Sequence, residues 1–236
     1  MCANFHRMAL AHCSAAGVVL PDPGLAWLPL AAPSARPDRW QQVGACYLRA
    51  MQAALAYAEL NRKRMLEAIA EVFGRHFPDP FVWDDAVNIH HNDATLETHF
   101  GREVWVHRKG AVKASAGTAT VTPGSMGTGS VLGRGLGNPD AFCSAAHGAG
   151  RAMSRSRARK ELSLQDQLAL VSGAGGKVFA ASKTGVLDEM PGAYKDLDEV
   201  MARQSDLVEP VVRFTPLGTY KGVEKGRGKL RTDEER

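Results

Sequence analysis

The sequence predicts an α+β protein with a mixed, largely antiparallel sheet and flanking helices. Two observations support this fold class. One long stretch in the first third repeats its apolar residues at helical spacing, and a glycine-, valine- and threonine-rich middle alternates in the manner of strands. The chain has 236 residues, which is enough to bury a sizeable core in one large or two small domains.

The composition is that of an ordinary soluble protein. Hydrophobic residues make up 44% of the chain and charged residues 23%. The net charge of +4 permits an anionic partner. No apolar run approaches the length of a membrane span, and the N-terminus lacks a signal-peptide layout. The four cysteines have no paired spacing, so we expect reduced thiols, a cytoplasmic location and no membrane partner.

The first part of the chain divides into two segments. Residues 1–37 carry five prolines, which predict an irregular N-terminal segment. Residues 38–76 predict one long helix, bent near "NRKR", whose apolar face packs into a core. The apolar positions of that face include Tyr47, Met51, Leu55, Ala58, Leu66, Ile69 and Phe73.

The remainder predicts a sheet followed by short helices. Of the 24 glycines, 11 lie between residues 101 and 150, which indicates tight turns between strands. Ser163 is a candidate helix cap. The expected strands cover 102–110, 117–124 and 129–135, the helices 158–173 and 195–206, a terminal strand pair 208–222, and a charged, disordered tail 223–236.

Two motifs are candidates for chemistry. "NIHHND" contains His90 and His91, and imidazole is a common ligand of transition metals, although surface or core histidines are the commoner explanation. "TPGSMGTGS" (122–130) is a glycine- and hydroxyl-rich loop that could cradle phosphate with backbone N–H groups. No Gly-Lys-Ser/Thr follows it, so it is not a P-loop, and a plain hairpin loop is the alternative.

A third motif, "CSAAHGAGRAMSR", places His147 between small residues and ahead of two arginines. Gly148 and Gly150 allow close backbone approach to a ligand, and Arg151 and Arg155 offer forked donors suited to phosphate. The pattern suits a histidine that carries a nucleotidyl group. A helix start with a buried, satisfied histidine is the alternative.

These motifs together resemble one known family. "NIHHND", "HFGREVWVHRKGA", "PGSMGTGS", "RGLGNPDAFCSAAHGAGRAMSR" and "AYKDLDEVMARQSDLVE" occur in the order found in RtcB RNA-splicing ligases. The resemblance implies a GTP- and manganese-dependent enzyme that joins RNA 3′-phosphate or 2′,3′-cyclic phosphate ends to 5′-hydroxyl ends. It also implies tRNA splicing or RNA repair, with tRNA halves or broken RNA ends as partners.

The resemblance assigns roles to individual positions. His147 matches the histidine that becomes guanylylated, and His91 matches a metal-binding histidine, which implies Mn²⁺. Lys221 matches the lysine that contacts guanine. The nucleotide contacts implied are Asn92, Pro123, Gly124, Ser125, Met126, Ser130, His147, Gly148, Ala149, Gly150, Tyr194 and Lys221.

The sequence also departs from the family pattern. The family's Asp-x-Gly-Cys-Gly and Asn-His-Phe motifs, which supply further metal ligands, are not present. Residues 38–222 therefore resemble the C-terminal part of an RtcB-type ligase domain, with a fold incomplete at the N-terminus. We expect either a truncated or split ligase, with a separately encoded N-terminal half and an archease-like activator as candidate partners, or a catalytically inactive remnant that binds RNA or nucleotide.

Overall fold

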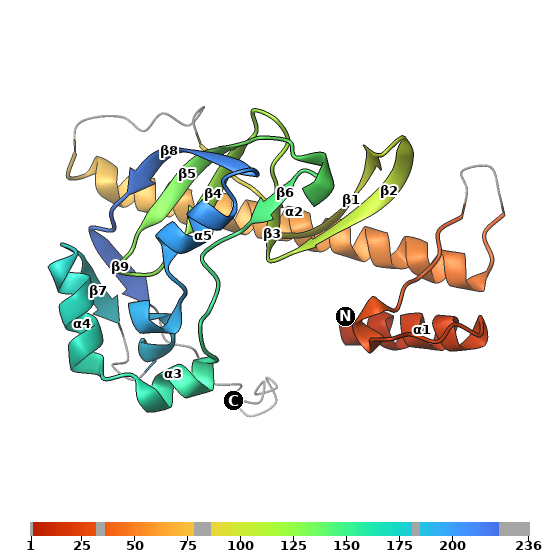
Figure 1. The fold of residues 1–236 in the computed structure, drawn as a ribbon, viewed down its shortest axis with the longest axis horizontal. Helices are drawn as coiled ribbons and strands as arrows, with labels where there is room; N and C mark the ends of the chain where they lie inside the picture. Colours follow the sequence, from red (N-terminus) through yellow and green to blue (C-terminus); the bar gives the residue numbers. More distant parts are fainter. Residues whose placement is uncertain (1, 32–35, 78–85, 181–184, 222–236) are drawn as a thin grey trace, which may run out of the picture. The chain divides into compact units, whose positions relative to one another are not determined.

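The computed structural model describes residues 2–31, 36–77, 86–180 and 185–221 (Figure 1). The chain forms two compact units, Met1–Trp83 and Asp84–Arg236, which are described separately below. Within the described residues, none of the helices combines the length and apolar character that a membrane span needs.

The first unit begins with a helix, α1 (Cys2–Ala15), followed by a short 3-10 helix, η1 (Pro23–Leu25). The prediction of an irregular segment was therefore wrong for residues 2–15. The prolines begin only at Pro21, so they do not interrupt residues 2–15, and the helix ends just before Gly17, whose φ is +69°. Ala9 and Cys13 lie one turn apart and are both buried, which stabilises α1 by burying one face.

The long helix α2 (Arg39–Gly74) confirms the prediction for residues 38–76, and it continues through "NRKR" as one helix. Asp38 and Gln41 form a capping box at its start. The Gln41 amide donates to Asp38 Oδ1 over 2.8 Å, and the Asp38 amide donates to Gln41 Oε1 over 2.9 Å. These bonds satisfy two backbone N–H groups that the first turn would otherwise leave unpaired.

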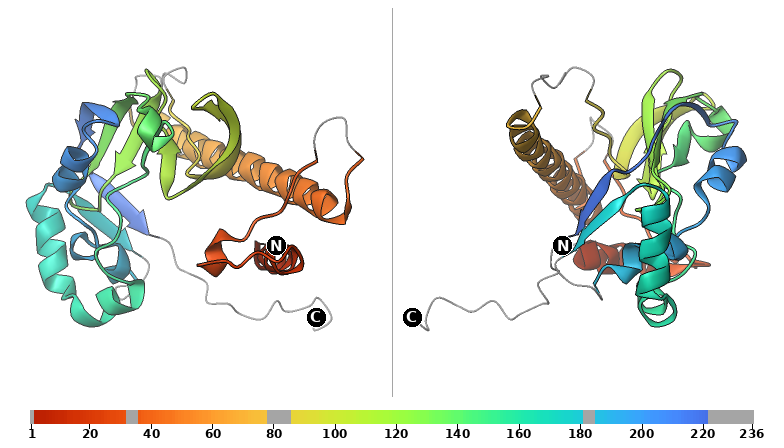
Figure 2. Two further views of the ribbon diagram at one scale, coloured as in Figure 1. Left: turned by 45° about the vertical axis from the view of Figure 1, so that its right-hand side comes forward. Right: turned by 90° about the vertical axis from the view of Figure 1, so that its left-hand side faces the viewer.

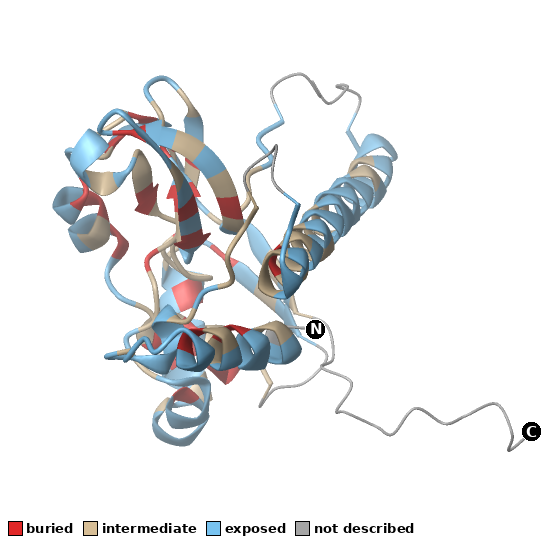
Figure 3. Ribbon diagram, turned by 90° about the vertical axis from the view of Figure 1, so that its right-hand side faces the viewer, coloured by how far each residue is buried: buried red, intermediate tan, exposed pale blue. Residues whose placement is uncertain are grey.

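The apolar face of α2 does not form the predicted core. Gly44 is the one buried residue of this helix. The second half of α2 is coloured exposed over most of its length in Figure 3. Its exposed apolar side chains are Tyr57, Leu60, Met65, Leu66, Ile69, Val72 and Phe73. Periodicity identifies which face of a helix is apolar, but it does not show what covers that face.

The described residues of the second unit form four small sheets in place of the single sheet that was predicted. The α+β class is confirmed. Three sheets are antiparallel and the fourth is a parallel pair. The pairs are β1 (Asn92–His99) with β2 (Arg102–Lys109), β3 (Ala111–Lys113) with β6 (Ser144–Ala146), β4 (Ala119–Pro123) with β5 (Ser130–Gly135) and β8 (Val208–Phe214), and β7 (Lys177–Ala180) with β9 (Gly218–Lys221).

The strands predicted around residues 102–110, 117–124 and 129–135 are confirmed. The stretch 208–222 also contains two strands, but the prediction that they pair with each other is wrong. β8 pairs with β5, whereas β9 runs parallel to β7. Gly129 explains how β8 reaches the β4–β5 loop so closely. Its φ is +79°, and a Cβ there would lie 2.0 Å from the Phe214 carbonyl oxygen, so only glycine fits.

The helical stretch predicted at 158–173 is two helices, α3 (Arg155–Glu161) and α4 (Leu164–Gly173). Ser163 caps α4, as predicted, by accepting a hydrogen bond from the Asp166 amide over 3.4 Å. Leu162 takes an extended conformation between the two helices, with φ −85° and ψ 133°. Two 3-10 turns, η4 (Leu187–Glu189) and η5 (Pro191–Ala193), then lead into α5 (Leu197–Arg203).

Two features connect three of these small sheets. A buried hydrophobic cluster joins the β3–β6 and β4–β5–β8 sheets to α5, and it includes Val112, Val131, Ala145, Leu197 and Val208. A buried ion pair fixes the β1–β2 hairpin, because Arg108 donates to both carboxylate oxygens of Glu97, over 2.7 and 3.0 Å, and to Ser144 on β6 over 3.0 Å. The Arg108 hydrogen bonds hold the pKa of Glu97 far below its ordinary value.

Candidate functional site

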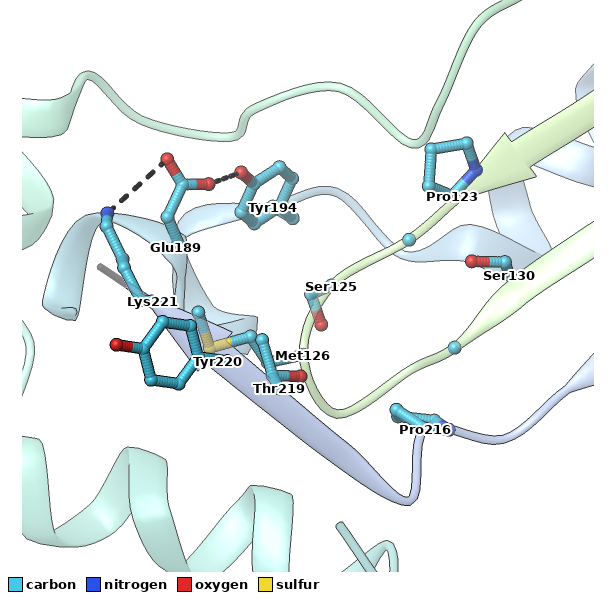
Figure 4. A pocket seen from close by; sticks show the side chains of 12 residues that line it. Pro123, Ser125, Met126, Ser130, Glu189, Tyr194, Pro216, Thr219, Tyr220 and Lys221 are labelled. Atoms are coloured by element: carbon cyan, nitrogen blue, oxygen red, sulfur yellow. Dashed lines mark hydrogen bonds and ion pairs between the residues drawn. The ribbon is translucent and has the colours of Figure 1, made fainter. Parts of the chain in front are cut away.

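A pocket of about 400 Å³ opens in the second unit between three segments (Figure 4). These segments are the loop that joins β4 to β5, the η4–η5 region and strand β9. The lining residues are Pro123, Gly124, Ser125, Met126, Gly129, Ser130, Glu189, Tyr194, Pro216, Thr219, Tyr220 and Lys221. Segments separated by up to about a hundred residues along the chain therefore form one cavity.

The loop between β4 and β5 is held closed by its own hydroxyl groups. The Ser125 amide donates to Thr128 Oγ1 over 2.7 Å, and the Gly127 amide donates to Ser125 Oγ over 3.3 Å. The Gly124 amide donates to the Gly129 carbonyl over 2.7 Å. These amides are already satisfied in this conformation, so a phosphate cradle built from them would require the loop to rearrange.

His147 follows β6, and its ring is anchored by the backbone of Gly110. The His147 Nδ1 atom lies 2.7 Å from the Gly110 carbonyl oxygen. A carbonyl oxygen can only accept, so Nδ1 carries the hydrogen and donates it. In the neutral ring, Nε2 then carries the free lone pair, and it is the atom that could act as a nucleophile or bind a metal.

The Gly110 backbone lies directly beside the His147 ring. Gly110 has φ +69°, and a Cβ at this position would lie 3.4 Å from His147 Cε1 and 3.5 Å from Nδ1. The His91 ring stacks on the His147 ring, with centroids 5.1 Å apart and 9° between their planes. The Gly110 amide donates to the His91 carbonyl over 2.9 Å, so one glycine positions both histidines.

The segment after His147 connects the histidine to the pocket. The Ala149 amide donates to the carbonyl of Pro123, a pocket-lining residue, over 2.9 Å. A Cβ at Gly148 would lie 3.0 Å from the same carbonyl oxygen, so the close approach favours glycine. Within the described part of the chain, the amides of Gly148 and Gly150 have no hydrogen-bond acceptor, and they could therefore donate to an anion.

A fully buried carboxylate, Asp188, anchors the cationic side of the pocket. Its side chain is 0% exposed and accepts from Lys221 Nζ over 2.9 Å, Arg155 Nη1 over 2.7 Å and Arg159 Nη2 over 3.0 Å. Burial alone would raise the pKa of Asp188, but these hydrogen bonds and positive charges outweigh burial and lower it to about 2. Asp188 therefore remains ionised and fixes the position of Lys221.

The neighbouring Glu189 holds the aromatic wall of the pocket. The Tyr194 hydroxyl donates to Glu189 Oε2, and the Lys221 ammonium lies 3.8 Å from Glu189 Oε1, as drawn in Figure 4. Burial, followed by the hydrogen bond to Glu189, raises the pKa of Tyr194 to about 12. The Arg151 guanidinium lies over the Tyr194 ring, 5.0 Å from its centroid.

Comparison with known proteins identifies what this chain resembles. The family model "tRNA-splicing ligase RtcB" matches residues 1–222. The chain belongs to the RtcB family. It is 44% identical to the RNA-splicing ligase RtcB of Escherichia coli K12 over 181 residues, which cover 75% of this chain and 43% of that protein.

Alignments with two further RtcB relatives cover a larger share of this chain. The RNA-splicing ligase RtcB of Mycobacterium tuberculosis is 38% identical over 226 residues, which cover 87% of this chain and 50% of that protein. The tRNA-splicing ligase RtcB of Aeropyrum pernix is 32% identical over 231 residues, covering 87% of this chain and 46% of that protein. The chain thus spans half or less of the length of these curated relatives.

The structure gathers most, but not all, of the positions that the RtcB resemblance predicted. Seven of them line the pocket: Pro123, Gly124, Ser125, Met126, Ser130, Tyr194 and Lys221. His147, Gly148, Ala149 and Gly150 lie on the adjoining segment, and His91 stacks on His147. Asn92 begins β1 opposite Lys109 and does not line the pocket. The roles of all these residues stay predictions.

Three residues that the motifs did not single out take part in the site: Gly110, Asp188 and Glu189. Gly110 stood inside the quoted "HFGREVWVHRKGA" motif without a role. Asp188 and Glu189 lie just ahead of "AYKDLD". An adjacent acidic pair a few residues before a family motif was the available signal, but its value depends on the distant Lys221.

The described residues do not fit a complete manganese site. Among them, no group of three or more His, Cys, Asp or Glu side chains could hold a metal ion. His91 and His147 offer two imidazoles, whereas a catalytic site normally takes about three protein ligands. A manganese ion would need ligands from outside the described residues.

Proposed function

We propose that this chain is the nucleotide-attachment part of an RtcB-type RNA ligase. The proposed reaction joins RNA 3′-phosphate or 2′,3′-cyclic phosphate ends to 5′-hydroxyl ends at the expense of GTP, in tRNA splicing or RNA repair. The observation that carries the proposal is the anchoring of His147 beside a pocket lined by seven of the positions that the family pattern assigns to the nucleotide.

In this proposal, Nε2 of His147 is the nucleophile. Its lone pair forms a bond to the α-phosphorus of GTP, the bond from that phosphorus to the bridging oxygen breaks, and pyrophosphate leaves. Nδ1 keeps its hydrogen and continues to donate it to the Gly110 carbonyl, and this hydrogen bond keeps the ring oriented. The amides of Gly148 and Gly150 donate to the phosphate oxygens, where negative charge accumulates.

Around the pocket, the proposed roles follow from the family resemblance. Lys221 donates to the guanine base and is held by buried Asp188, and Tyr194 forms a wall beside the base and is held by the partly buried Glu189. Ser125, Met126 and Ser130 line the opposite wall from the β4–β5 loop. Asn92 stays a proposed nucleotide contact that the present conformation does not bring to the pocket.

We further propose that manganese is held jointly by His91 and by ligands on a separately encoded N-terminal half. The chain alone spans half or less of its relatives, and its described residues offer no complete metal site. The isolated chain is therefore expected not to join RNA ends with manganese. An archease-like activator is a further candidate partner by family resemblance alone.

The test is transfer of radiolabel from [α-³²P]GTP to protein in the presence of Mn²⁺. We would assay the chain alone and a chimaera in which it replaces the matched stretch of the E. coli ligase. The chimaera should become labelled, and His147→Ala should abolish the label. His107→Ala, which removes an exposed histidine on β2, is the matched control and should leave labelling unchanged.

Label retained by His147→Ala would contradict the assignment of the nucleophile. A folded chimaera that binds GTP but never becomes labelled would favour the second candidate function, a catalytically inactive remnant that binds RNA or nucleotide. The incomplete set of metal ligands among the described residues is the observation that supports this second candidate.

A further inference from the structure

The two-stranded sheet β7–β9 has one inner and one outer face, and burial alternates accordingly. On β7, Val178 is partly buried against a hydrophobic cluster, whereas Lys177 and Phe179 are exposed, as is Ala180 at the end of the strand. On β9, Thr219 and Lys221 are partly buried and Tyr220 is exposed. Because side chains alternate along strands, Lys177, Phe179 and Tyr220 share the outer face.

The outer face is aromatic where a solvent-facing strand is ordinarily polar. Phe179 and Tyr220 are directly paired in the register of the two strands, which run side by side in Figure 2, and their side chains are 56% and 78% exposed. Two exposed aromatic side chains facing the same side of a short sheet provide a flat apolar surface.

Gly218 shapes this surface. The position that a Cβ of Gly218 would take lies 3.4 Å from Phe179 Cε2 and 3.9 Å from Cδ2. The Phe179 ring therefore lies against β9 beside Gly218. Lys177 begins β7 on the same face, so the two aromatic side chains have a cation beside them.

The aromatic surface adjoins the pocket. Tyr220 lines the pocket together with Lys221, the next residue on β9. Tyr194 also lines the pocket, but the Arg151 guanidinium already lies over its ring. Tyr220 has no aromatic or cationic neighbour over its ring among the described residues. Its ring is therefore accessible to a ligand at the edge of the site.

We propose that Phe179 and Tyr220 form a stacking surface for unpaired bases of single-stranded RNA, with Lys177 contacting the RNA phosphates. The proposal deepens, and rests on, the proposed RNA-ligase function. Exposed aromatic rings beside lysine on a sheet face suit single-stranded nucleic acid, because every base offers a π-face and every nucleotide a phosphate. Tyr220 also lines the pocket of the proposed RNA ligase, which favours RNA as the occupant.

The experiment measures binding of a fluorescein-labelled eight-nucleotide oligouridylate with a 3′-phosphate to the purified chain by fluorescence anisotropy. Phe179→Ala and Tyr220→Ala should each weaken binding about 10-fold, because one base–aromatic stack contributes that order of affinity. Tyr220→Phe should bind within about twofold of the original chain, since it keeps the ring. Val211→Ala, an exposed apolar position on β8, is the matched control and should bind unchanged.

An abasic oligomer of the same length separates stacking from charge. The original chain and Phe179→Ala should bind the abasic probe equally, whereas Lys177→Ala should weaken both probes and reduce the salt dependence. Alanine variants that bind oligouridylate like the original chain would overturn the proposal. A loss of equal size on the abasic probe would also overturn it, because the rings would then act through folding or charge.

The GTP-labelling assay of the chimaera distinguishes this proposal from the function on which it rests. Phe179→Ala should keep His147 labelling and lose RNA affinity. Labelling of His147 without any oligouridylate binding by the original chain would overturn the stacking surface alone. Ring-dependent RNA binding without labelling would support the surface and count against the ligase chemistry.

Discussion

Two sides of the site are held in place by different means: the cationic side, at Lys221, and the histidine side, at His147 and His91. Lys221 is fixed by an ion pair to Asp188, a carboxylate with 0% exposure that two arginines also contact. His147 is fixed by one hydrogen bond to a backbone carbonyl and by the stacked His91 ring. In the proposed function, this chain therefore supplies the cationic side of the site by itself, whereas a metal ion beside His147 would need ligands from outside the described residues.

The prediction with the largest expected effect tests whether Asp188 holds Lys221 and two arginines in place. Asp188→Asn removes the buried charge and leaves three cations without their common partner, so the free energy of unfolding should fall by about 3 kcal/mol. Urea unfolding followed by circular dichroism measures the change. The matched control is Asp198→Asn, because Asp198 pairs with Arg213 on the surface, and it should change stability by less than about 1 kcal/mol. Equal effects of the two substitutions would contradict the role of Asp188.

Acid should remove the contribution of Asp188 to the free energy of unfolding. The pKa of Asp188 is lowered from 3.8 to about 2, so its ionised form stabilises the folded state fully above pH 3.8. This contribution, about 2 kcal/mol, is lost as the pH falls through 2. The difference in unfolding free energy between the original chain and Asp188→Asn should therefore shrink between pH 4 and pH 2. A difference that stays constant over this range would show that Asp188 is not held in this way.

A third prediction concerns the histidine side. Gly110→Ala strains a residue with φ +69° and places a methyl group 3.4 Å from the His147 ring. Gly117→Ala introduces similar strain at φ +79°, but no atom lies within 4 Å of its Cβ position. Both should lower stability by about 1 kcal/mol. Only Gly110→Ala should reduce His147 labelling in the chimaera, by about 10-fold, and equal labelling of the two variants would remove the role given to Gly110.

The smallest effect is spectroscopic. Tyr194 should ionise near pH 12, because burial and the hydrogen bond to Glu189 raise its pKa. The folded state therefore binds more protons than the unfolded state between pH 10 and pH 12, and stability should fall across that range. Absorbance titration of tyrosinate, with Tyr194→Phe to assign the step, measures this pKa. Glu189→Gln should lower it toward 10, and an unchanged pKa would mean that Glu189 does not hold the ring.

The sequence allowed the local features of the fold to be predicted. Helical periodicity located α2, and Ser163 was recognised as the cap of α4. The pairing of β9 with β7 could not be predicted, because it depends on packing between segments about forty residues apart. The exposure of the α2 face could not be predicted either, since the apolar spacing of Leu66 and Ile69 is the same whether or not a partner covers them.

The site residues that depend on contacts between distant segments could not be predicted from the sequence either. The family pattern predicted most of the pocket lining, and the role of His147 as the nucleophile stays a prediction. The sequence could not indicate the role of Asp188. Its three partners lie 29 to 33 residues away along the chain, and only folding brings them together. Gly110 was overlooked for a similar reason, because its contact with His147 spans 37 residues.

The most direct test of the central claim is calorimetric titration of the purified chain, first with GDP in the presence of a chelator and then with Mn²⁺ alone. The chain should bind GDP without metal, and Lys221→Ala should weaken that binding about 10-fold, because Lys221 supplies a charged donor in the pocket. Manganese alone should show no saturable site tighter than millimolar. Tight, stoichiometric manganese binding by the isolated chain, together with no affinity for GDP, would contradict the claim.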